Sequence, residues 1–107
     1  MIRVSILYPN TEGSRFDLDY YLNTHMPMTE KLLAPNLKSM AVEHGIAGTT
    51  PGSKPTYIAL CHLTFDSIDA FLEVFMPHMA TLTGDIPHYT DVEAVIQFND
   101  VKIARSF

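Results

Sequence analysis

His25, in the segment YLNTHMPM, is the residue whose position most directly suggests chemistry. Just before it, Leu18, Tyr21 and Leu22 recur at intervals of three and four residues. This spacing predicts an amphipathic helix whose apolar side faces the core. His25 occupies the next position on that side, where Leu or Ile is expected. Because imidazole accepts or releases a proton near neutral pH, a histidine among apolar neighbours is a candidate general acid or base.

Pro27 lies two residues after the histidine and interrupts the same helix. Proline has no backbone N–H, and its ring clashes with the carbonyl group four residues earlier, which here belongs to Asn23. A local bend at this point would turn the His25 ring toward the edge of a cavity. The alternative is structural, because a histidine on an apolar helix face is commonly a core residue whose ring bonds to a backbone carbonyl. Both interpretations of His25 remain open.

Further residues are weaker candidates for contact with a ligand. Tyr21 lies one helical turn before His25, and Leu22 shares the apolar face. His62, on a predicted strand, either faces a cavity between two subunits or is an ordinary half-buried strand residue. Tyr89, in the segment IPHYTD, either covers the mouth of a pocket or packs within a turn. With His25 as the candidate catalytic residue, the candidate ligand-binding residues are Tyr21, Leu22, Pro27, His62 and Tyr89.

The sequence lacks the common motifs of cofactor, phosphate and metal sites. No GxGxxG follows a strand and no P-loop is present, so neither a nicotinamide site of the Rossmann type nor a nucleotide-phosphate site is predicted. The five histidines form no HxH or HExxH pair, which argues against a metal site. No basic neighbour activates Cys61, which predicts an inert thiol. A Ser-His-Asp arrangement remains open, although no nucleophile elbow is present, and we expect no cofactor.

Hydrophobic periodicity predicts the elements that position these residues. We expect strands at 2–8, 37–46, 56–65 and 91–98. We also expect a first helix from Ser14 or Asp17 to about Leu33 and a second from Asp66 or Ser67 to Gly84, bent at Pro77. The resulting β-α-β-β-α-β order predicts a ferredoxin-like α+β fold. In this fold an antiparallel sheet carries both helices on one face.

Length and composition indicate a single globular domain over residues 1–107. The chain is 47% apolar and 18% charged, and its net charge of −5 argues against a nucleic-acid partner. No window approaches the roughly 20 apolar residues of a membrane span, and MIRVSILYP contains no signal-peptide cleavage site. With only one cysteine, these features predict a cytoplasmic protein without an internal disulfide.

Apolar side chains are predicted on both faces of the sheet. Leu7 alternates with Ile6, and Ile58 and Leu60 alternate with Cys61, so four or five apolar groups remain on the face that the helices leave open. An exposed patch of this kind usually marks a contact site. A second copy packed sheet against sheet would bury it, which predicts a homodimer enclosing a largely apolar space.

Two motifs, FDLDYYLNTHMPM at residues 16–28 and GDIPHYTDVEAVIQ at residues 84–97, resemble the EthD family, small proteins associated with ethyl tert-butyl ether degradation. With the Pro- and Gly-rich loop between them, the resemblance covers nearly the whole chain. It implies a dimeric α/β barrel of the ferredoxin-like type and places the HxP motif of the family at His25 and Pro27. Members are often named reductases or oxidoreductases, and some fungal relatives act in aromatic polyketide tailoring.

Two functional hypotheses follow. In the first, the protein is a small enzyme without an organic cofactor, and His25 transfers a proton on an apolar, aromatic or enolisable molecule; by resemblance, the enzyme would be an oxidoreductase. In the second, it is a non-catalytic accessory protein that holds such a molecule for an oxygenase-type degradation pathway. Both hypotheses predict a second copy of the chain and an apolar or aromatic small molecule as partners, and neither nucleic acid nor membrane.

Overall fold

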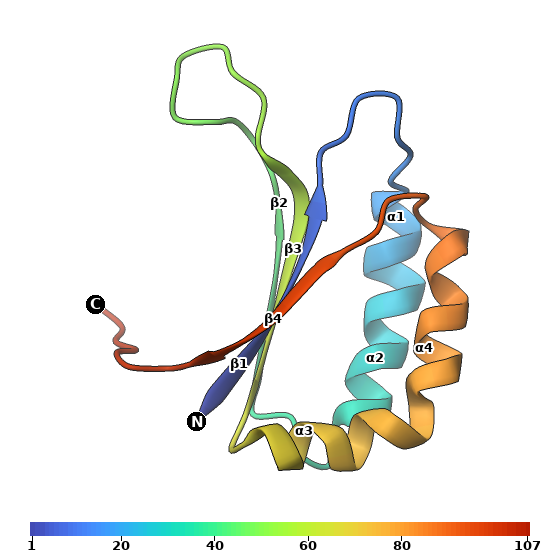
Figure 1. The fold of residues 1–107 in the computed structure, drawn as a ribbon, viewed down its shortest axis with the longest axis vertical. Coiled ribbons are helices and arrows are strands. Elements are labelled where there is room, and N and C mark those ends of the chain that lie inside the picture. The colour runs from blue at the N-terminus through green and yellow to red at the C-terminus, as the bar shows by residue number, and fades with distance from the viewer.

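A four-stranded antiparallel sheet forms the centre of the computed structural model, which describes residues 1–107. The strands are β1 (Ile2–Pro9), β2 (Ser39–His44), β3 (Tyr57–Phe65) and β4 (Val95–Asp100). Their order in the sheet is β2-β3-β1-β4 (Figure 1). In the middle of the sheet, Ile6 on β1 pairs with Cys61 on β3 and with Ile96 on β4. With helices on one face only, this topology confirms the predicted ferredoxin-like α+β fold.

The first helical segment contains a π-helical turn directly before the proline. Its parts are α1 (Leu18–Tyr20), the π-helical turn η1 (Tyr21–His25) and α2 (Met26–Leu33). Asp17 caps it, since the Asp17 carboxylate accepts the N–H of Tyr20 at 3.1 Å. The N–H of Met26 donates to the carbonyl of Tyr21, five residues back. The helix therefore widens next to Pro27, where an α-helical donor is missing.

The second helical segment breaks at Pro77, the position at which the sequence predicts a bend. Its parts are α3 (Ile68–Phe75), the 3-10 turn η2 (Met76–His78), α4 (Met79–Asp85) and the 3-10 turn η3 (Ile86–His88). Ser67 caps α3, accepting the N–H of Ala70 at 3.0 Å, as predicted. Before the break, α3 lies across one end of the sheet, and after it α4 runs beside α2 (Figure 1).

Gly84 does not end the second helical segment, and this part of the sequence prediction is wrong. Asp85 is still part of α4, and the 3-10 turn η3 extends the helical segment by three more residues. The N–H of Tyr89 then donates to the carbonyl of Ile86 at 3.0 Å. This extension matters for the site because it keeps Asp85 within the helical segment and places Tyr89 directly after it, beside the first helical segment.

The last strand begins at Val95 instead of residue 91. The residues before it are bound to the loop that leads into α1, and they cannot at the same time pair with β1. The N–H of Arg15 donates to the Asp91 carboxylate at 2.9 Å, and the Thr90 hydroxyl donates to the Arg15 carbonyl at 2.7 Å. These bonds hold the segment that carries Tyr89 against the start of the first helical segment.

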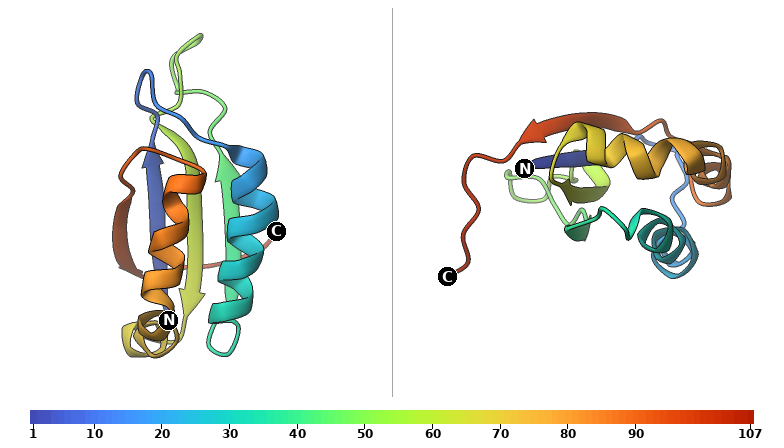
Figure 2. Two further views of the ribbon diagram at one scale, coloured as in Figure 1. Left: turned by 90° about the vertical axis from the view of Figure 1, so that its right-hand side faces the viewer. Right: turned by 90° about the horizontal axis from the view of Figure 1, so that it is seen from below.

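The core lies between the sheet and the helical segments, which cover the same side of the sheet (Figure 2). Aromatic side chains gather at one end of it, where the Tyr8 ring lies 5.2 Å from that of Phe16. The buried apolar residues are Val4, Tyr8, Tyr21, Met26, Leu33, Ala59, Cys61, Leu63, Phe65, Phe71, Val74, Leu82 and Tyr89.

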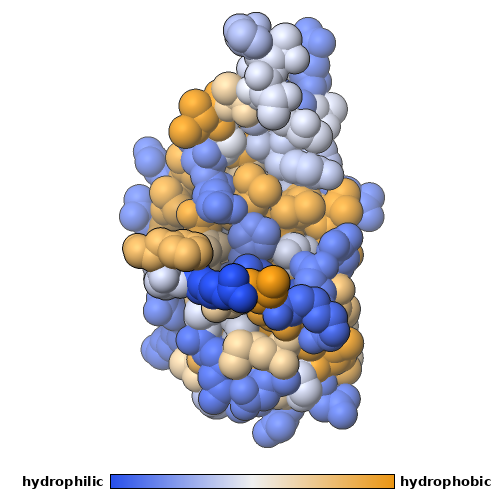
Figure 3. All heavy atoms as spheres, turned by 90° about the vertical axis from the view of Figure 1, so that its left-hand side faces the viewer, coloured by the Kyte–Doolittle hydropathy of each residue, from blue (hydrophilic) through white to orange (hydrophobic).

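The opposite face of the sheet has no helix over it. Leu7 pairs with Leu60 and Val95 across the three strands β3, β1 and β4, so these apolar side chains share the uncovered face. Figure 3 shows apolar patches alternating with polar ones on this face.

No helix of the structure combines the length and the apolar character that crossing a bilayer requires.

Candidate functional site

An apolar cavity of about 280 Å³ lies between the sheet and the two helical segments. Most of the lining side chains are apolar, and burial of apolar surface would dominate the binding of a ligand. Leu72, Ile96 and Phe98 line the cavity and are 38%, 58% and 43% exposed, which locates its mouth between α3 and β4. The lining residues that carry a polar side-chain atom are Tyr8, His25, Thr29, Thr83 and Tyr89.

His25 lines this cavity and is only 7% exposed. It is the last residue of the π-helical turn η1, and its ring stacks on that of Tyr21 with centroids 5.6 Å apart. The Thr29 hydroxyl donates to the His25 carbonyl at 2.9 Å and secures the backbone one turn later. The backbone and the ring plane of His25 are both held by neighbouring groups.

Asp85 is the partner of the His25 ring. Its carboxylate lies 2.9 Å from Nδ1 of His25, and its other oxygen accepts the Tyr20 hydroxyl at 2.7 Å. An ionised carboxylate can only accept hydrogen bonds, so Nδ1 must be the donor. In the neutral ring Nε2 is then unprotonated and has a free lone pair. Sequence spacing did not identify Asp85, although it belongs to the GDIPHY part of the second motif quoted above.

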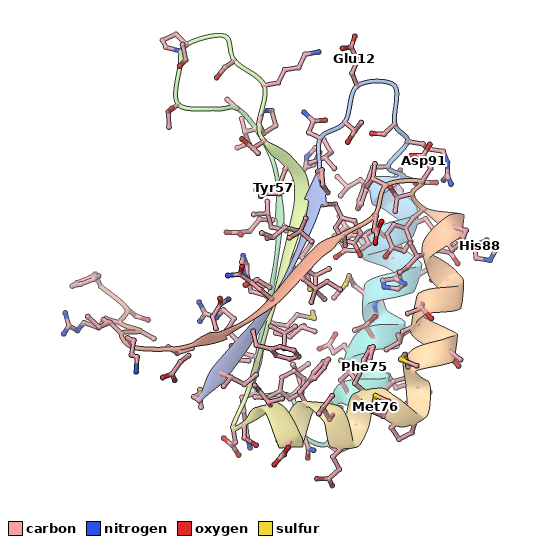
Figure 4. All side chains as sticks on the ribbon, viewed as in Figure 1. Glu12, Tyr57, Phe75, Met76, His88 and Asp91 are labelled. Carbon is pink, nitrogen blue, oxygen red and sulfur yellow. The ribbon has the colours of Figure 1, made fainter.

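The pKa of Asp85 lies below its ordinary value. Burial acts to raise this pKa, but the hydrogen bonds from Tyr20 and His25 outweigh burial and favour the ionised form. Tyr20 is itself steadied by His88, whose ring lies 5.8 Å away in a stacked arrangement and points outward from the helices (Figure 4). The result is a carboxylate that stays ionised behind the histidine.

Tyr89 stands on the cavity side of the same ring. Its hydroxyl lies 3.5 Å from Nε2 of His25 and 2.7 Å from the hydroxyl of Tyr8. The first distance exceeds the usual 2.7–3.2 Å range of a hydrogen bond to nitrogen, so Nε2 is only weakly engaged. Burial, together with the neighbouring Tyr8 hydroxyl, raises the pKa of Tyr89 and keeps the hydroxyl neutral. The structure thus brings two of the predicted site residues, His25 and Tyr89, together at the cavity.

The other predicted residues of the first helical segment lie outside the cavity lining. Tyr21 is 1% exposed and supports the ring of His25 from behind. Leu22 is 42% exposed and lies on the outer surface of the helix, because the π-helical turn rotates it away from the core side. Pro27 is exposed as well. Tyr21, Leu22 and Pro27 would therefore influence a ligand in this cavity only through the position of His25.

His62 lies on the open face of the sheet, away from the cavity between helices and sheet. Its Nδ1 is 2.9 Å from the Ser5 hydroxyl and its Nε2 is 3.1 Å from the Glu43 carboxylate. Asn99 in turn donates to the Ser5 hydroxyl at 2.9 Å. These side chains form a polar row across the four strands, and His62 belongs to it.

Cys61 is buried, and burial raises the pKa of its thiol to about 11. A protonated thiol is a poor nucleophile and a poor metal ligand, so this geometry favours an inert cysteine. The structure contains no group of three or more His, Cys, Asp or Glu side chains arranged to hold a metal ion. The His25–Asp85 pair with Tyr89 is therefore the group in this cavity with the clearest capacity for chemistry, which is proton transfer.

Comparison with known proteins identifies the family. The model of the EthD domain matches residues 13–93. The structure of an EthD-like protein from Ralstonia eutropha JMP134 superposes with a TM-score of 0.94 at 40% sequence identity, covering 98% of this chain and 95% of the other. Among functionally curated proteins, no match to the chain is found.

Two more distant structures share the fold. An ethyl tert-butyl ether (EthD) family protein from Bacillus halodurans C-125 has a TM-score of 0.67 at 20% identity, over 94% of this chain and 98% of the other. HapK from Hahella chejuensis has a TM-score of 0.59 at 14% identity, over 100% and 99%. The extent of the family match and the 40% identity to the Ralstonia protein lead to one conclusion. This chain is a member of the EthD family.

Proposed function

We propose that this EthD family protein binds an apolar small molecule in the cavity and transfers a proton at a carbon atom next to a carbonyl group. The observation that carries the proposal is the orientation of His25. Its Nδ1 is 2.9 Å from the ionised Asp85, while Nε2 faces the cavity with only a 3.5 Å neighbour. A general base needs such a free nitrogen beside the bound substrate.

The proposed reaction is the interconversion of a ketone and its enol. Nε2 of His25 takes a proton from the carbon next to the carbonyl, and the electron pair of the C–H bond moves to form the C=C bond. The Tyr89 hydroxyl donates a hydrogen bond to the oxygen on which negative charge develops. The same proton then passes from Nε2 to that oxygen, which gives the enol. Asp85 stabilises the imidazolium that exists between the two steps.

The apolar walls support this chemistry in two ways. Contacts with Leu63, Phe71 and Phe75 would remove water from the substrate, which strengthens the electrostatic effect of Asp85 and Tyr89. The walls also favour an apolar or aromatic substrate over a charged one, since no Lys or Arg lines the cavity. The proton transfer itself requires no organic cofactor, and we include none.

The proposal extends to the assembly and location of the protein. The uncovered sheet face carries Leu7, Leu60 and Val95, and a second copy packed on it would remove them from water. We therefore propose a homodimer of the α/β barrel type. The single cysteine, which is buried and has no internal disulfide partner, fits a cytoplasmic location.

The test uses 2-tetralone, a two-ring ketone with exchangeable hydrogens beside its carbonyl. In D₂O, the wild-type protein should accelerate hydrogen–deuterium exchange at these positions, measured by NMR. His25→Leu should remove the acceleration, and its melting temperature should fall only modestly, because Asp85 loses the bond from Nδ1 but keeps the bond from Tyr20. The control His44→Leu changes an exposed histidine on β2 and should exchange like the wild type.

Two other results would argue against a catalytic His25. Equal exchange with wild type and His25→Leu would show that His25 is not the base. Binding of 2-tetralone without any accelerated exchange would instead support the second hypothesis, a non-catalytic protein that holds its ligand for an oxygenase-type degradation pathway.

A further inference from the structure

The polar atoms around the cavity offer a ligand mostly hydrogen-bond acceptors. The hydroxyl of Thr29 donates to the His25 carbonyl at 2.9 Å, and the hydroxyl of Thr83 donates to the Met79 carbonyl at 2.7 Å. Each hydroxyl has one hydrogen, so both threonines retain only acceptor capacity toward the cavity. Neither can donate to a carbonyl or ether oxygen of a bound molecule.

His25 presents an acceptor for a different reason. Its one ring proton, in the neutral form, is held on Nδ1 by Asp85 at 2.9 Å. Nε2 consequently presents a lone pair to the cavity. A ligand that offers no hydrogen at this point would leave a buried acceptor unpaired, which is unfavourable for binding.

The remaining donor belongs to the hydrogen-bonded pair Tyr8 and Tyr89, which both line the cavity. The hydroxyls of Tyr8 and Tyr89 lie 2.7 Å apart, and when Tyr8 donates, the single hydrogen of Tyr89 is available to His25 or to a ligand. In the structure it meets Nε2 across 3.5 Å, a distance longer than a good hydrogen bond. A ligand that takes this hydrogen must therefore return one to Nε2, or the histidine loses its partner.

A hydroxyl group satisfies both requirements, since it accepts from Tyr89 and donates to Nε2 of His25. A ketone or an ether can only accept. The volume of about 280 Å³ is compatible with a two-ring molecule, because a cavity of about 150 Å³ holds benzene. The aromatic side chains Phe71, Phe75 and Phe98 favour flat ring systems.

We propose that the cavity selects hydroxylated aromatic molecules, or the enol form of a ketone, over ketones and ethers of the same shape. This inference deepens the proposed function, because it concerns the same cavity and predicts that the enol side of the reaction is bound more tightly. It also predicts that a simple ether, which has no hydrogen to donate, is a poor ligand of this member of the family.

The experiment compares 2-naphthol, 2-methoxynaphthalene and naphthalene in titration calorimetry. The ring system is constant while the hydroxyl is methylated or absent. The wild-type protein should bind 2-naphthol roughly tenfold or more tightly than either analogue, as expected for leaving one buried polar group unpaired. In His25→Leu, the affinities for 2-naphthol and 2-methoxynaphthalene should converge to within about a factor of two, because both can accept from Tyr89 and neither has a histidine nitrogen to donate to.

Two further variants guard against a trivial result. Tyr89→Phe removes the donor but leaves Nε2 of His25, so the preference for 2-naphthol over 2-methoxynaphthalene should persist. Naphthalene should still bind to this variant, which would show that the cavity is intact. His44→Leu, on the exposed β2 strand, should keep the wild-type preference. Equal or tighter binding of 2-methoxynaphthalene, or no binding of 2-naphthol, would overturn the inference.

The outcome is separable from that of the proposed function. A protein that exchanges 2-tetralone hydrogens through His25 but binds naphthol and methoxynaphthalene alike would keep the function and lose this inference. A protein that prefers 2-naphthol but accelerates no exchange would keep the inference and lose the catalytic role.

Discussion

At the scale of single residues, the chemistry of the cavity depends on Asp85. Its two oxygens accept hydrogen bonds from His25 and Tyr20, at 2.9 and 2.7 Å, and these bonds lower its pKa against the effect of burial. Because the carboxylate is ionised, it fixes the proton of His25 on the side away from the cavity. Removing its charge should therefore affect both the reaction and the acid stability of the fold.

We expect Asp85→Asn to lose most of the His25-dependent exchange, because an amide can donate to Nδ1 and so permits the opposite ring tautomer. The pKa of Asp85 is lower in the folded protein than in the unfolded chain, where it is about 4. Its contribution to the free energy of unfolding is therefore present above about pH 4 and is lost as the pH falls through the pKa of the folded protein. The free energies of unfolding of wild type and Asp85→Asn should therefore differ most near pH 7 and converge as the pH drops below about 4. Urea titrations from pH 3 to 7 measure this difference.

Glu12→Gln is the matched control, since Glu12 projects from the loop after β1 into solvent (Figure 4). It should unfold like the wild type throughout this range. A constant difference between wild type and Asp85→Asn at every pH would show that the Asp85 carboxylate is not stabilised by its neighbours.

Sequence reasoning identifies His25 and Tyr89 but not Asp85. His25 is visible because it breaks an apolar spacing within one helix, a local pattern. Asp85 lies 60 residues away, and its approach depends on how two helical segments pack against each other. The sequence predicts that the helix ends at Gly84, whereas the helical segment continues through His88 and places Asp85 beside the first helical segment.

At the scale of elements, the π-helical turn η1 orients the side chain of His25. The turn includes Tyr21 and ends at His25, and Pro27 follows two residues later without a donor for the carbonyl of Asn23. An ordinary α-helix would rotate the side chains of this segment relative to α2. The position of His25 over the cavity thus depends on the widened turn.

We expect Pro27→Ala to convert the turn toward α-helix, because alanine supplies the missing N–H and removes an unfavourable helix residue worth up to about 3 kcal/mol. The melting temperature should rise or stay level, while the His25-dependent exchange falls. A crystal structure of the variant would reveal the change in the turn. Thr24→Ala, at an exposed position of the same turn, is the control. An unchanged His25 position together with unchanged exchange would mean that Pro27 affects packing only.

The sequence predicts which helices and strands are present more accurately than it predicts where they begin and end. Alternation gives all four strands, and the Ser67 cap and the end of α2 at Leu33 are predicted correctly. The bend at Pro77 is predicted, because proline interrupts a helix by itself, whereas the late start of β4 is missed. That start depends on the bonds between Arg15 and residues 90 and 91, a tertiary contact that no local pattern contains.

At the scale of the whole molecule, the sheet has one covered and one uncovered face. Leu7, Leu60 and Val95 share a row on the uncovered face, beside the polar row that contains Ser5 and His62. Light scattering should give about twice the chain mass of 12.0 kDa at micromolar concentration. Leu60→Glu should produce monomers, because two charges would meet in the apolar centre of the interface.

The control for this experiment is Ile46→Glu, which makes the same kind of change at a loop residue that is 93% exposed. It should leave the mass unchanged. A wild-type protein that scatters as a monomer of 12.0 kDa would contradict the proposed homodimer, although it would leave the cavity and its histidine intact.

The most direct test of the account is the protonation of the His25 ring, measured by NMR on protein labelled with ¹⁵N. We expect Nδ1 to carry the proton in the neutral ring and Nε2 to be bare, with the Nε2 resonance shifting when 2-naphthol is added. These two results would follow from the 2.9 Å bond to Asp85 and from an open Nε2 at the cavity. A proton on Nε2 in the neutral ring, or an Nε2 resonance that does not respond to the ligand, would contradict the assignment of His25 as the base.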